Sequence, residues 1–304
     1  MSSLLSRWLI GVAAAPAALA SGASAAEPVE NPAIVVVGEQ EEQRRTALKQ
    51  FVRELGVANG ERPAARWVDP VCPTVTGLAP ALASIVELRV RKIARNVGAR
   101  TAGKRCKPNI VIAFSGDGGA LARAIRARAP TRLSEVPVTN RPDLFDGKAP
   151  IRWWYSTEAR DSSGIAASSI LPPWTAGNSA AGGSVLPMND SSTSSNHYNS
   201  SLISTQMMRA LQSATVLIDA NLAEGQSLSS IADYAALVAL AEIQLGARPA
   251  NSVLSLFSNP DAPTRMSVRD EAFLKALYRL PLDRRAHQQR ARLVNEMAEP
   301  RGGN

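Results

Sequence analysis

Histidine is nearly absent from this chain, which has only His197 and His287 among its 304 residues. Cysteine is as rare, since only Cys72 and Cys106 carry thiols. A catalytic zinc site takes three protein ligands, and a Ser-His or Cys-His pair needs its histidine beside the nucleophile. Neither histidine stands at metal-ligand spacing from the other. These shortages make metal-dependent and nucleophilic catalysis the weaker interpretations, and we predict no cofactor.

Long apolar runs are also missing, apart from a short one near the N-terminus. The first 25 residues combine Arg7, the stretch WLIGVAAAPAALA and the small residues ASA at 23–25. This order is typical of a signal peptide. The stretch is shorter than the roughly 20 residues of a membrane span and contains Pro16, although an uncleaved anchor helix is the alternative. We therefore predict an exported protein, periplasmic or secreted, with no membrane span in the mature chain.

The two cysteines suit such an oxidising compartment. An isolated pair there is more often a disulfide than two free thiols. A bond between Cys72 and Cys106 would close a loop of about 35 residues, which the chain-entropy model values at about 4 kcal/mol. The alternative, a catalytic thiol, has no histidine nearby. The sequence therefore predicts a Cys72–Cys106 disulfide.

Acidic residues are too few to balance the basic ones: 34 Lys and Arg against 26 Asp and Glu give a formal net charge of +8. Apolar residues at helical spacing predict an amphipathic helix from about Pro80 to Val97. Four cations occupy its other positions: Arg89, Arg91, Lys92 and Arg95. They form either an ordinary solvated face or a patch for an anionic polymer or an envelope protein. Nucleic acid is not an expected partner, because predicted export and the lack of an aromatic-basic module disfavour it.

No internal repeat divides the rest of the chain. We predict one α+β domain over residues 27–280, followed by a polar and charged tail at 281–304 that could form a solvent-exposed helix. Apolar runs predict strands at PAIVVVG (32–38), PNIVIAF (108–114), PIRWWYST (150–157) and ATVLIDA (214–220). A Ser- and Gly-rich stretch from Arg160 to Ser204 predicts long loops or short edge strands, which argues against a regular doubly wound sheet. The expected architecture is a mixed, twisted sheet packed on several helices.

Two helices carry N-terminal capping signals. Ser230 and Asp233 match a capping box at the start of a helix that Gly246 would end, and its apolar residues run nearly all round, which predicts burial. Ser267 and Asp270 repeat the box before a last apolar helix. A further helix, ending at Gly56, is expected after the first strand.

The turn FSGDGG, between a predicted strand and helix, invites a phosphate-loop interpretation. It lacks the lysine and hydroxyl of a P-loop, and Leu121 stands where a dinucleotide motif has its third glycine. An ordinary turn is favoured. Asp117 and Asp219 each follow a strand and could form a glycosidase-like carboxylate pair, although such aspartates are more often caps or turn formers. The aromatics of RWWY could line a groove for sugars or peptides, or pack in the core.

The order of these elements resembles a known group. PNIVIAF followed by a helix, ATVLIDANLAEG leading into IADYAALVALAEI, then SVLSLFSNP and SVRDEAFLKALYR is similar to a set of exported bacterial domains of unknown function. RWVDPVCPTVTGL also resembles an N-terminal piece of alphaproteobacterial hypothetical proteins. These domains are similar in fold to zincin metallopeptidases. The resemblance covers residues 66–279 and implies a zincin-like fold, in which a helix after an edge strand carries the HExxH motif.

This chain departs from the zincin pattern at that helix. HExxH works because residues four apart share a helix face and present two imidazoles to zinc. Here Ala232, Ala236 and Leu240 stand at that spacing, and residues 231–243 contain no histidine. The metal ligands of zincins therefore have no matching positions in this sequence.

We accordingly expect a non-catalytic exported protein with a degenerate protease-like fold, acting by binding or as an envelope component. The alternatives are an envelope hydrolase that uses Asp117 and Asp219, and an anion-binding surface protein that uses the cations of the Pro80–Val97 helix.

Overall fold

The computed structural model describes residues 32–103, 105–161, 205 and 207–299. The chain divides into two compact units, residues 1–40 and residues 41–304, and everything discussed below as a site belongs to the second. In the described part of the chain, none of the helices has the length and apolar character that a membrane span requires. The predicted signal peptide, the Ser- and Gly-rich stretch at 162–204 and His197 all lie outside the described residues.

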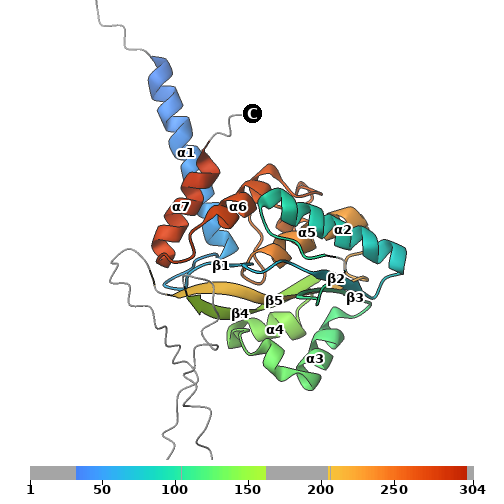
Figure 1. Cartoon of the computed structure of the whole chain (residues 1–304). Helices are drawn as coiled ribbons and strands as arrows, with labels where there is room; N and C mark the ends of the chain where they lie inside the picture. The colour runs from blue at the N-terminus through green and yellow to red at the C-terminus, as the bar shows by residue number, and fades with distance from the viewer. Residues whose placement is uncertain (1–31, 104, 162–204, 206, 300–304) are drawn as a thin grey trace, which may run out of the picture. The chain divides into compact units, whose positions relative to one another are not determined.

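A mixed sheet of mainly parallel strands forms the centre of the second unit (Figure 1). Its strands are β1 (Ala65–Arg66), β2 (Pro73–Thr76), β3 (Ile110–Ser115), β4 (Ile151–Asp161) and β5 (Met207–Asp219). β2, β3 and β5 are parallel neighbours, and β1 pairs in parallel with the first part of β5. β4 runs antiparallel to β5. The prediction of a mixed sheet packed on helices is therefore confirmed.

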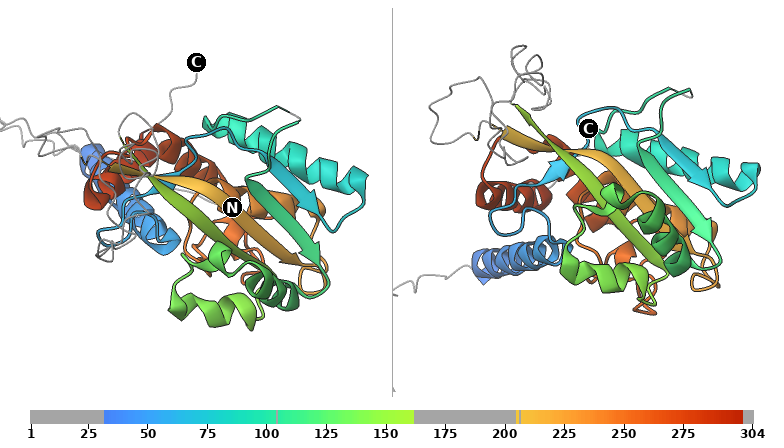
Figure 2. Two further views of the ribbon diagram at one scale, coloured as in Figure 1. Left: turned by 60° about the horizontal axis from the view of Figure 1, so that its bottom comes forward. Right: turned by 90° about the horizontal axis from the view of Figure 1, so that it is seen from below.

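Helices cover both faces of this sheet (Figure 2). They are α1 (Pro32–Leu55), α2 (Pro80–Val97), α3 (Gly118–Arg128), α4 (Arg141–Phe145), α5 (Leu228–Leu240), α6 (Val268–Arg279) and α7 (Ala286–Ala298). α2, α5 and α6 lie over one face, and α3 and α4 over the other. This mixed α/β arrangement corrects the predicted α+β class. The Ser- and Gly-rich stretch whose composition suggested α+β falls between β4 and β5 in the sequence and lies largely outside the described residues.

The first predicted strand is an error. Residues 32–38, PAIVVVG, belong to α1, which continues to Leu55. β-Branched residues cost a helix only a few tenths of a kcal/mol each. The helix continues through Gly38 at the end of the run, although glycine in a helix interior costs about 1 kcal/mol relative to alanine. The predicted end at Gly56 is confirmed, because this glycine adopts a φ of +69° just after the helix.

The apolar helix α5 is buried, as predicted, but its ends differ from the prediction. Every residue from Ser230 to Leu240 is buried. Ser227, not Ser230, is the N-cap, and its hydroxyl accepts a hydrogen bond from the Ser230 backbone N–H. The helix stops at Leu240 rather than near Gly246. Ser227 already supplies the cap, so Asp233 lies within the helix and is free for other contacts.

Aromatic side chains satisfy the C-terminal carbonyls of α5. The Tyr155 hydroxyl donates to the Val238 carbonyl at 2.7 Å, the Trp67 indole to Ala239 at 2.8 Å and the Tyr278 hydroxyl to Leu240 at 2.9 Å. A buried helix end otherwise leaves such carbonyls without partners, at a cost in free energy. β4, α6 and the chain beside β1 are thereby tied to one helix end.

The last two helices close the described chain. At the start of α6 the predicted capping box is confirmed, with Ser267 and Asp270 bonded in both directions. Asp270 also accepts bonds from Ser252 and Val253, while its burial raises the pKa of its carboxyl group. The tail, for which the sequence allowed a solvent-exposed helix, does form a helix, α7, but that helix is not exposed on all sides. Apolar residues at helical spacing bury one side of α7, namely Leu293, Val294, Met297 and Ala298.

The Cys72–Cys106 disulfide predicted from the sequence is present. It joins the residue before β2 to the chain that leads into β3. Two backbone contacts accompany it, since the Cys72 N–H donates to the Asn109 side chain and the Asn109 N–H donates to the Cys72 carbonyl. The two parallel strands are therefore held together at their beginnings.

We expect Gly77→Ala to lower the free energy of unfolding by about 2 kcal/mol. Gly77 has a φ of +83°, and an added Cβ would lie 2.0 Å from the Phe114 carbonyl oxygen. Gly60→Ala is the matched control, because Gly60 also has a positive φ but has open space around it. Urea unfolding should show a smaller decrease in the free energy of unfolding for Gly60→Ala than for Gly77→Ala. Equal decreases would contradict the steric explanation.

Candidate functional site

Helix α5 carries a buried charged residue that ties it to its neighbours. Asp233 of α5 is completely buried and receives a guanidinium from each side. Arg89 donates from two nitrogens, Arg265 Nε donates at 2.8 Å, and the Met266 backbone N–H donates at 3.0 Å. Burial alone would raise the pKa of Asp233, but these hydrogen bonds hold that pKa below its ordinary value. α5 is thus joined to α2 and to the segment before α6.

Two of the four cations of the predicted anion patch form hydrogen bonds or ion pairs within the protein itself. Arg89 pairs with Asp233, and Arg91 donates to the Ala102 carbonyl and the Cys106 sulfur. Lys92 and Arg95 are exposed and have no ion pair or hydrogen bond within the described chain. The sequence pattern gave the correct helix, but it could not distinguish outward cations from those that reach back to the core.

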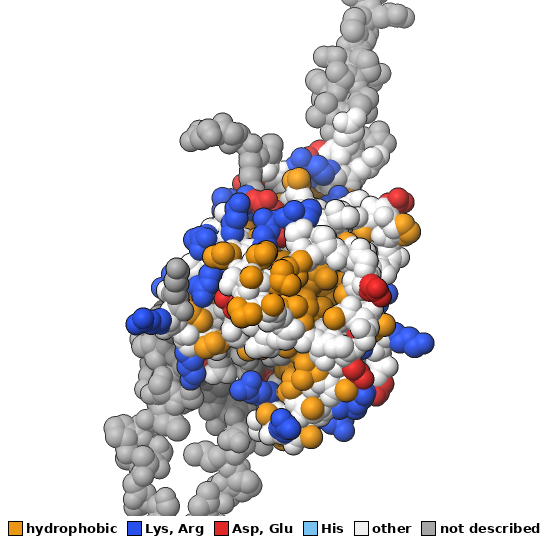
Figure 3. All heavy atoms as spheres, turned by 90° about the vertical axis from the view of Figure 1, so that its right-hand side faces the viewer, with side chains coloured by type: hydrophobic (Ala, Val, Ile, Leu, Met, Phe, Trp, Pro, Cys, Tyr) orange, Lys and Arg blue, Asp and Glu red, His pale blue; other side chains and the backbone are white. Residues whose placement is uncertain are grey.

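The outward surface of α2 is apolar in its first half. Leu82, Ile85 and Leu88 are 44, 52 and 62% exposed. The parallel strands point toward the right of Figure 1. Figure 3 shows the molecule from that side, where apolar side chains gather and Lys and Arg side chains lie around them. Lys92 and Arg95 follow at the C-terminal end of the helix. Of the four cations predicted as a solvated basic face or an anion patch, Lys92 and Arg95 are the two that are exposed and have no partner in the described chain.

Asp117 and Asp219 stand at the ends of neighbouring parallel strands, where each orders a turn. Asp117 is the N-cap of α3 and accepts the Ala120 N–H at 2.8 Å. Asp219 is buried, accepts the N–H groups of Gly118 and Leu222, and lies 3.9 Å from an Arg152 nitrogen. Both carboxylates therefore have the cap and turn contacts that were the alternative to catalysis.

A cavity of about 390 Å³ lies beside the C-terminal end of α5. Three of its walls come from the loop after α1, from the segment before α4 and from the chain that leaves α5. The fourth comes from β4. Its lining includes the following charged, polar and aromatic residues: Arg62, Glu135, Thr139, Trp153, Trp154, Tyr155 and Glu242.

The aromatics of RWWY serve both the core and this cavity. Trp153 and Tyr155 pack with the larger core on the α5 side, while Trp154 packs in a second cluster with Leu217 and Phe145. The expected alternation along β4 is thus observed. The Trp153 indole donates to the Ile243 carbonyl, and the Tyr155 hydroxyl accepts from the Ile243 N–H. These bonds fix the chain that leaves α5 as one wall of the cavity.

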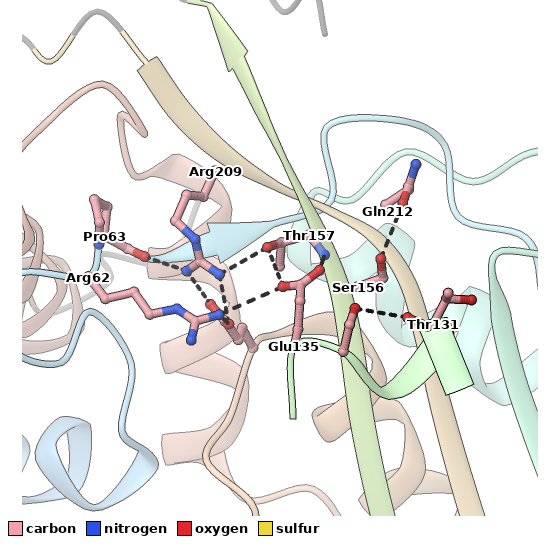
Figure 4. Close-up of polar contacts among 10 residues, drawn as sticks. Arg62, Pro63, Thr131, Glu135, Ser156, Thr157, Arg209 and Gln212 are labelled. Carbon is pink, nitrogen blue, oxygen red and sulfur yellow. Dashed lines mark hydrogen bonds and ion pairs between the residues drawn. The ribbon is translucent and has the colours of Figure 1, made fainter. Parts of the chain in front are cut away.

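Two arginines and two glutamates form a network at the cavity (Figure 4). Glu242 receives the Arg62 guanidinium at 2.6 Å and two nitrogens of Arg209 at 2.6 and 2.9 Å. Glu135 accepts both the backbone N–H and the hydroxyl of Thr157, and lies 3.9 Å from Arg62. The bidentate Arg209–Glu242 contact is a strong, directional type of ion pair. Arg62 is half exposed, whereas Glu242 and Arg209 are each 18% exposed.

This arrangement is better suited to holding a ligand than to proton transfer. The Glu242 carboxylate already accepts three guanidinium N–H groups, and the Glu135 carboxylate accepts two donors from Thr157. A general acid or base instead needs a carboxyl group within hydrogen-bond reach of the reacting atom and free to exchange its proton. In the described part of the chain, no group of three His, Cys, Asp or Glu residues is arranged to hold a metal ion.

Sequence reasoning did not identify the charged residues of this network. Arg62, Glu135, Arg209 and Glu242 come from four segments that are up to 180 residues apart. Each stands alone in the sequence, with no motif or spacing to mark it. The aromatic triplet at 153–155 was the only signal that pointed to this place.

Comparisons with known proteins supply no relative, because no family model, curated protein or solved structure matches the chain. The fold and the cavity define a mixed α/β protein with one aromatic-lined site whose charged groups are paired.

Proposed function

We propose that this chain is a non-catalytic exported protein that binds a small ligand in the aromatic-lined cavity. The observation that carries the proposal is the cavity itself, about 390 Å³ in volume and lined by Trp153, Trp154 and Tyr155. Ligand pockets are usually concave, largely apolar and provided with a few placed polar groups. The carboxylates of Glu135 and Glu242 and the Arg62 guanidinium supply those groups here.

The charge balance favours a neutral ligand. Arg62 and Arg209 offset Glu135 and Glu242, so the site offers hydrogen-bond donors and acceptors without net charge. Of the aromatic residues that line the cavity, the partly exposed Tyr155 offers apolar contact surface, whereas Trp153 and Trp154 are 2 and 5% exposed and mainly support the wall. A molecule with polar edges and an apolar face, such as a sugar ring, has this combination. We therefore propose a neutral saccharide unit as the ligand class.

The degenerate protease-like fold belongs to the same proposal. Its support is α5, a buried helix that follows a strand and carries hydrocarbon side chains where HExxH has histidines. The strand before it, β5, pairs with both β3 and β4 and is not the edge strand of the zincin pattern. The Arg89–Asp233–Arg265 cluster gives that helix an ion pair in place of a metal site. Export and an envelope role are supported by the predicted signal peptide and the disulfide.

Calorimetric titration with glucose, N-acetylglucosamine and their disaccharides tests the ligand class. We expect at least one of these sugars to bind, and Thr139→Trp to weaken that binding by about tenfold or more, because the larger side chain fills the cavity. Thr139 is exposed at the cavity wall, so the fold should tolerate the change.

Thr131→Trp is the matched control, since Thr131 is also exposed but does not line the cavity. It should bind the sugar as the unmodified chain does. Absence of binding by every sugar would reject the ligand class. Equal binding by Thr139→Trp and the unmodified chain would place the ligand elsewhere and reject the site.

An envelope hydrolase is the second candidate, and one observation favours it. Glu135 and Glu242 face the same cavity and are bridged by Arg62. Release of reducing sugar from a bound disaccharide, abolished by Glu242→Gln, would support this candidate over the non-catalytic one.

A further inference from the structure

A second cavity, of about 580 Å³, lies between the second half of α1 and α7. Four basic side chains line it and no acidic one does: Arg45, Lys49, Arg53 and Arg290. Its apolar contacts come from Val52, Val57, Ala291 and Val294. The cavity is on the other side of the 56–60 loop from the aromatic-lined site, and both cavities touch Gly56 and Asn59. None of its cations belongs to the patch that the sequence suggested on α2.

The four cations differ in the hydrogen bonds and ion pairs that they form with the rest of the protein. Arg45 contacts Glu41 and Asn295, and Arg290 donates to the carbonyls of Ala58 and Gly60. Lys49 and Arg53 are exposed and form no hydrogen bond or ion pair within the described chain. Like charges four residues apart on a helix destabilise it by a few tenths of a kcal/mol. The arrangement therefore has a small cost that a bound anion would remove.

The spacing indicates an anion with more than one charged group. Arg45, Lys49 and Arg53 stand at intervals of four residues, which places successive side chains about 6 Å apart along the helix. A single phosphate can contact one such cation well, whereas a linear chain of phosphates can contact two or three. Arg290 approaches from the opposite wall, so a ligand in the cavity would meet positive charge on both sides.

We propose that this cavity binds a small oligoanion that carries two or three phosphate groups. Lys49 and Arg53 contact it directly, and Arg290 and Arg45 complete the positive wall. The inference is independent of the saccharide proposal, because the cavity and its residues are different. It also differs from the α2 patch, which keeps only Lys92 and Arg95 as free cations in the described chain.

Titration of the whole protein with inorganic tripolyphosphate tests this site. We expect saturable binding that is about tenfold tighter than binding of orthophosphate. Lys49→Ala/Arg53→Ala should weaken tripolyphosphate binding by about tenfold or more, since hydrogen bonds to charged groups contribute on this scale. Lys49→Arg/Arg53→Lys, which conserves both charges, should bind tripolyphosphate within about threefold of the unmodified chain.

Lys92→Ala/Arg95→Ala is the matched control, because it removes one lysine and one arginine from another exposed helix face. It should leave tripolyphosphate binding unchanged. An equal loss in this control would show that the net charge of the chain attracts the anion, and it would overturn the proposal. Failure of the unmodified chain to bind tripolyphosphate would overturn it as well, whereas the sugar titration would be unaffected by either result.

Discussion

Reduction of the Cys72–Cys106 disulfide is expected to lower the free energy of unfolding by about 4 kcal/mol. The cysteines are 34 positions apart, so the bond restricts a sizeable loop of the unfolded chain. In the folded chain, the Cys72–Asn109 hydrogen bonds and the pairing of β2 with β3 can persist without the bond. Most of the loss should therefore come from the greater conformational freedom of the unfolded state.

Urea unfolding with and without a reductant measures this effect. Cys72→Ser/Cys106→Ser should have the stability of the reduced protein, and its transition should not shift on addition of reductant. A thiol count on the oxidised, denatured chain should find no free cysteine. Two reactive thiols, or an unchanged midpoint on reduction, would contradict the role of the bond.

Arg89→Met is expected to lower the free energy of unfolding by about 3 kcal/mol at neutral pH. Removing one partner from a buried ion pair leaves a charge without its main compensation, and such losses are typically 3–5 kcal/mol. A loss at the lower end of this range is expected here because Arg265 and the Met266 N–H continue to contact Asp233. Arg95→Met on the same helix is the control, since Arg95 is exposed and has no partner in the described chain.

The difference in free energy of unfolding between Arg89→Met and the unmodified chain should depend on pH. Hydrogen bonds lower the pKa of the Asp233 carboxyl group in the folded state. The ionised carboxylate therefore contributes its full stabilisation at pH values above its unfolded-state pKa of about 4. This stabilisation is lost as the pH falls through the lower pKa that Asp233 has in the folded state. Urea unfolding at pH 7 and pH 3 should therefore give a smaller difference at pH 3. A difference that does not change with pH would indicate lost packing instead of a lost ion pair.

Local patterns in the sequence predicted much of the fold. The Pro80–Val97 helix, the β3 strand, the capping box at Ser267 and the glycine at the end of α1 all depend on residues near one another in the chain. The disulfide could also be predicted, because two cysteines in a chain with a predicted signal peptide allow only one pairing. The predicted PAIVVVG strand was wrong because a short run of β-branched and apolar residues does not show whether the chain continues as a helix.

The candidate sites could not be predicted in the same way. Glu242 and Arg62 are 180 positions apart and meet only because α5 ends beside the 56–63 loop. The basic cavity likewise needs α7 to lie against α1. Sequence reasoning placed the anion patch on α2 because several cations are adjacent there. The structure shows that Arg89 and Arg91 turn toward partners that the helical pattern does not reveal.

By itself, the sequence determined most of the longer helices and strands, that α5 is buried and that it has no histidine to bind a metal. These properties follow from residue type and short-range spacing. Only the tertiary structure decided which charges are paired, which aromatic side chains border a cavity and which cations face solvent. Ion pairs and cavities depend on distances between segments remote in the chain, and the folded packing of those segments sets these distances.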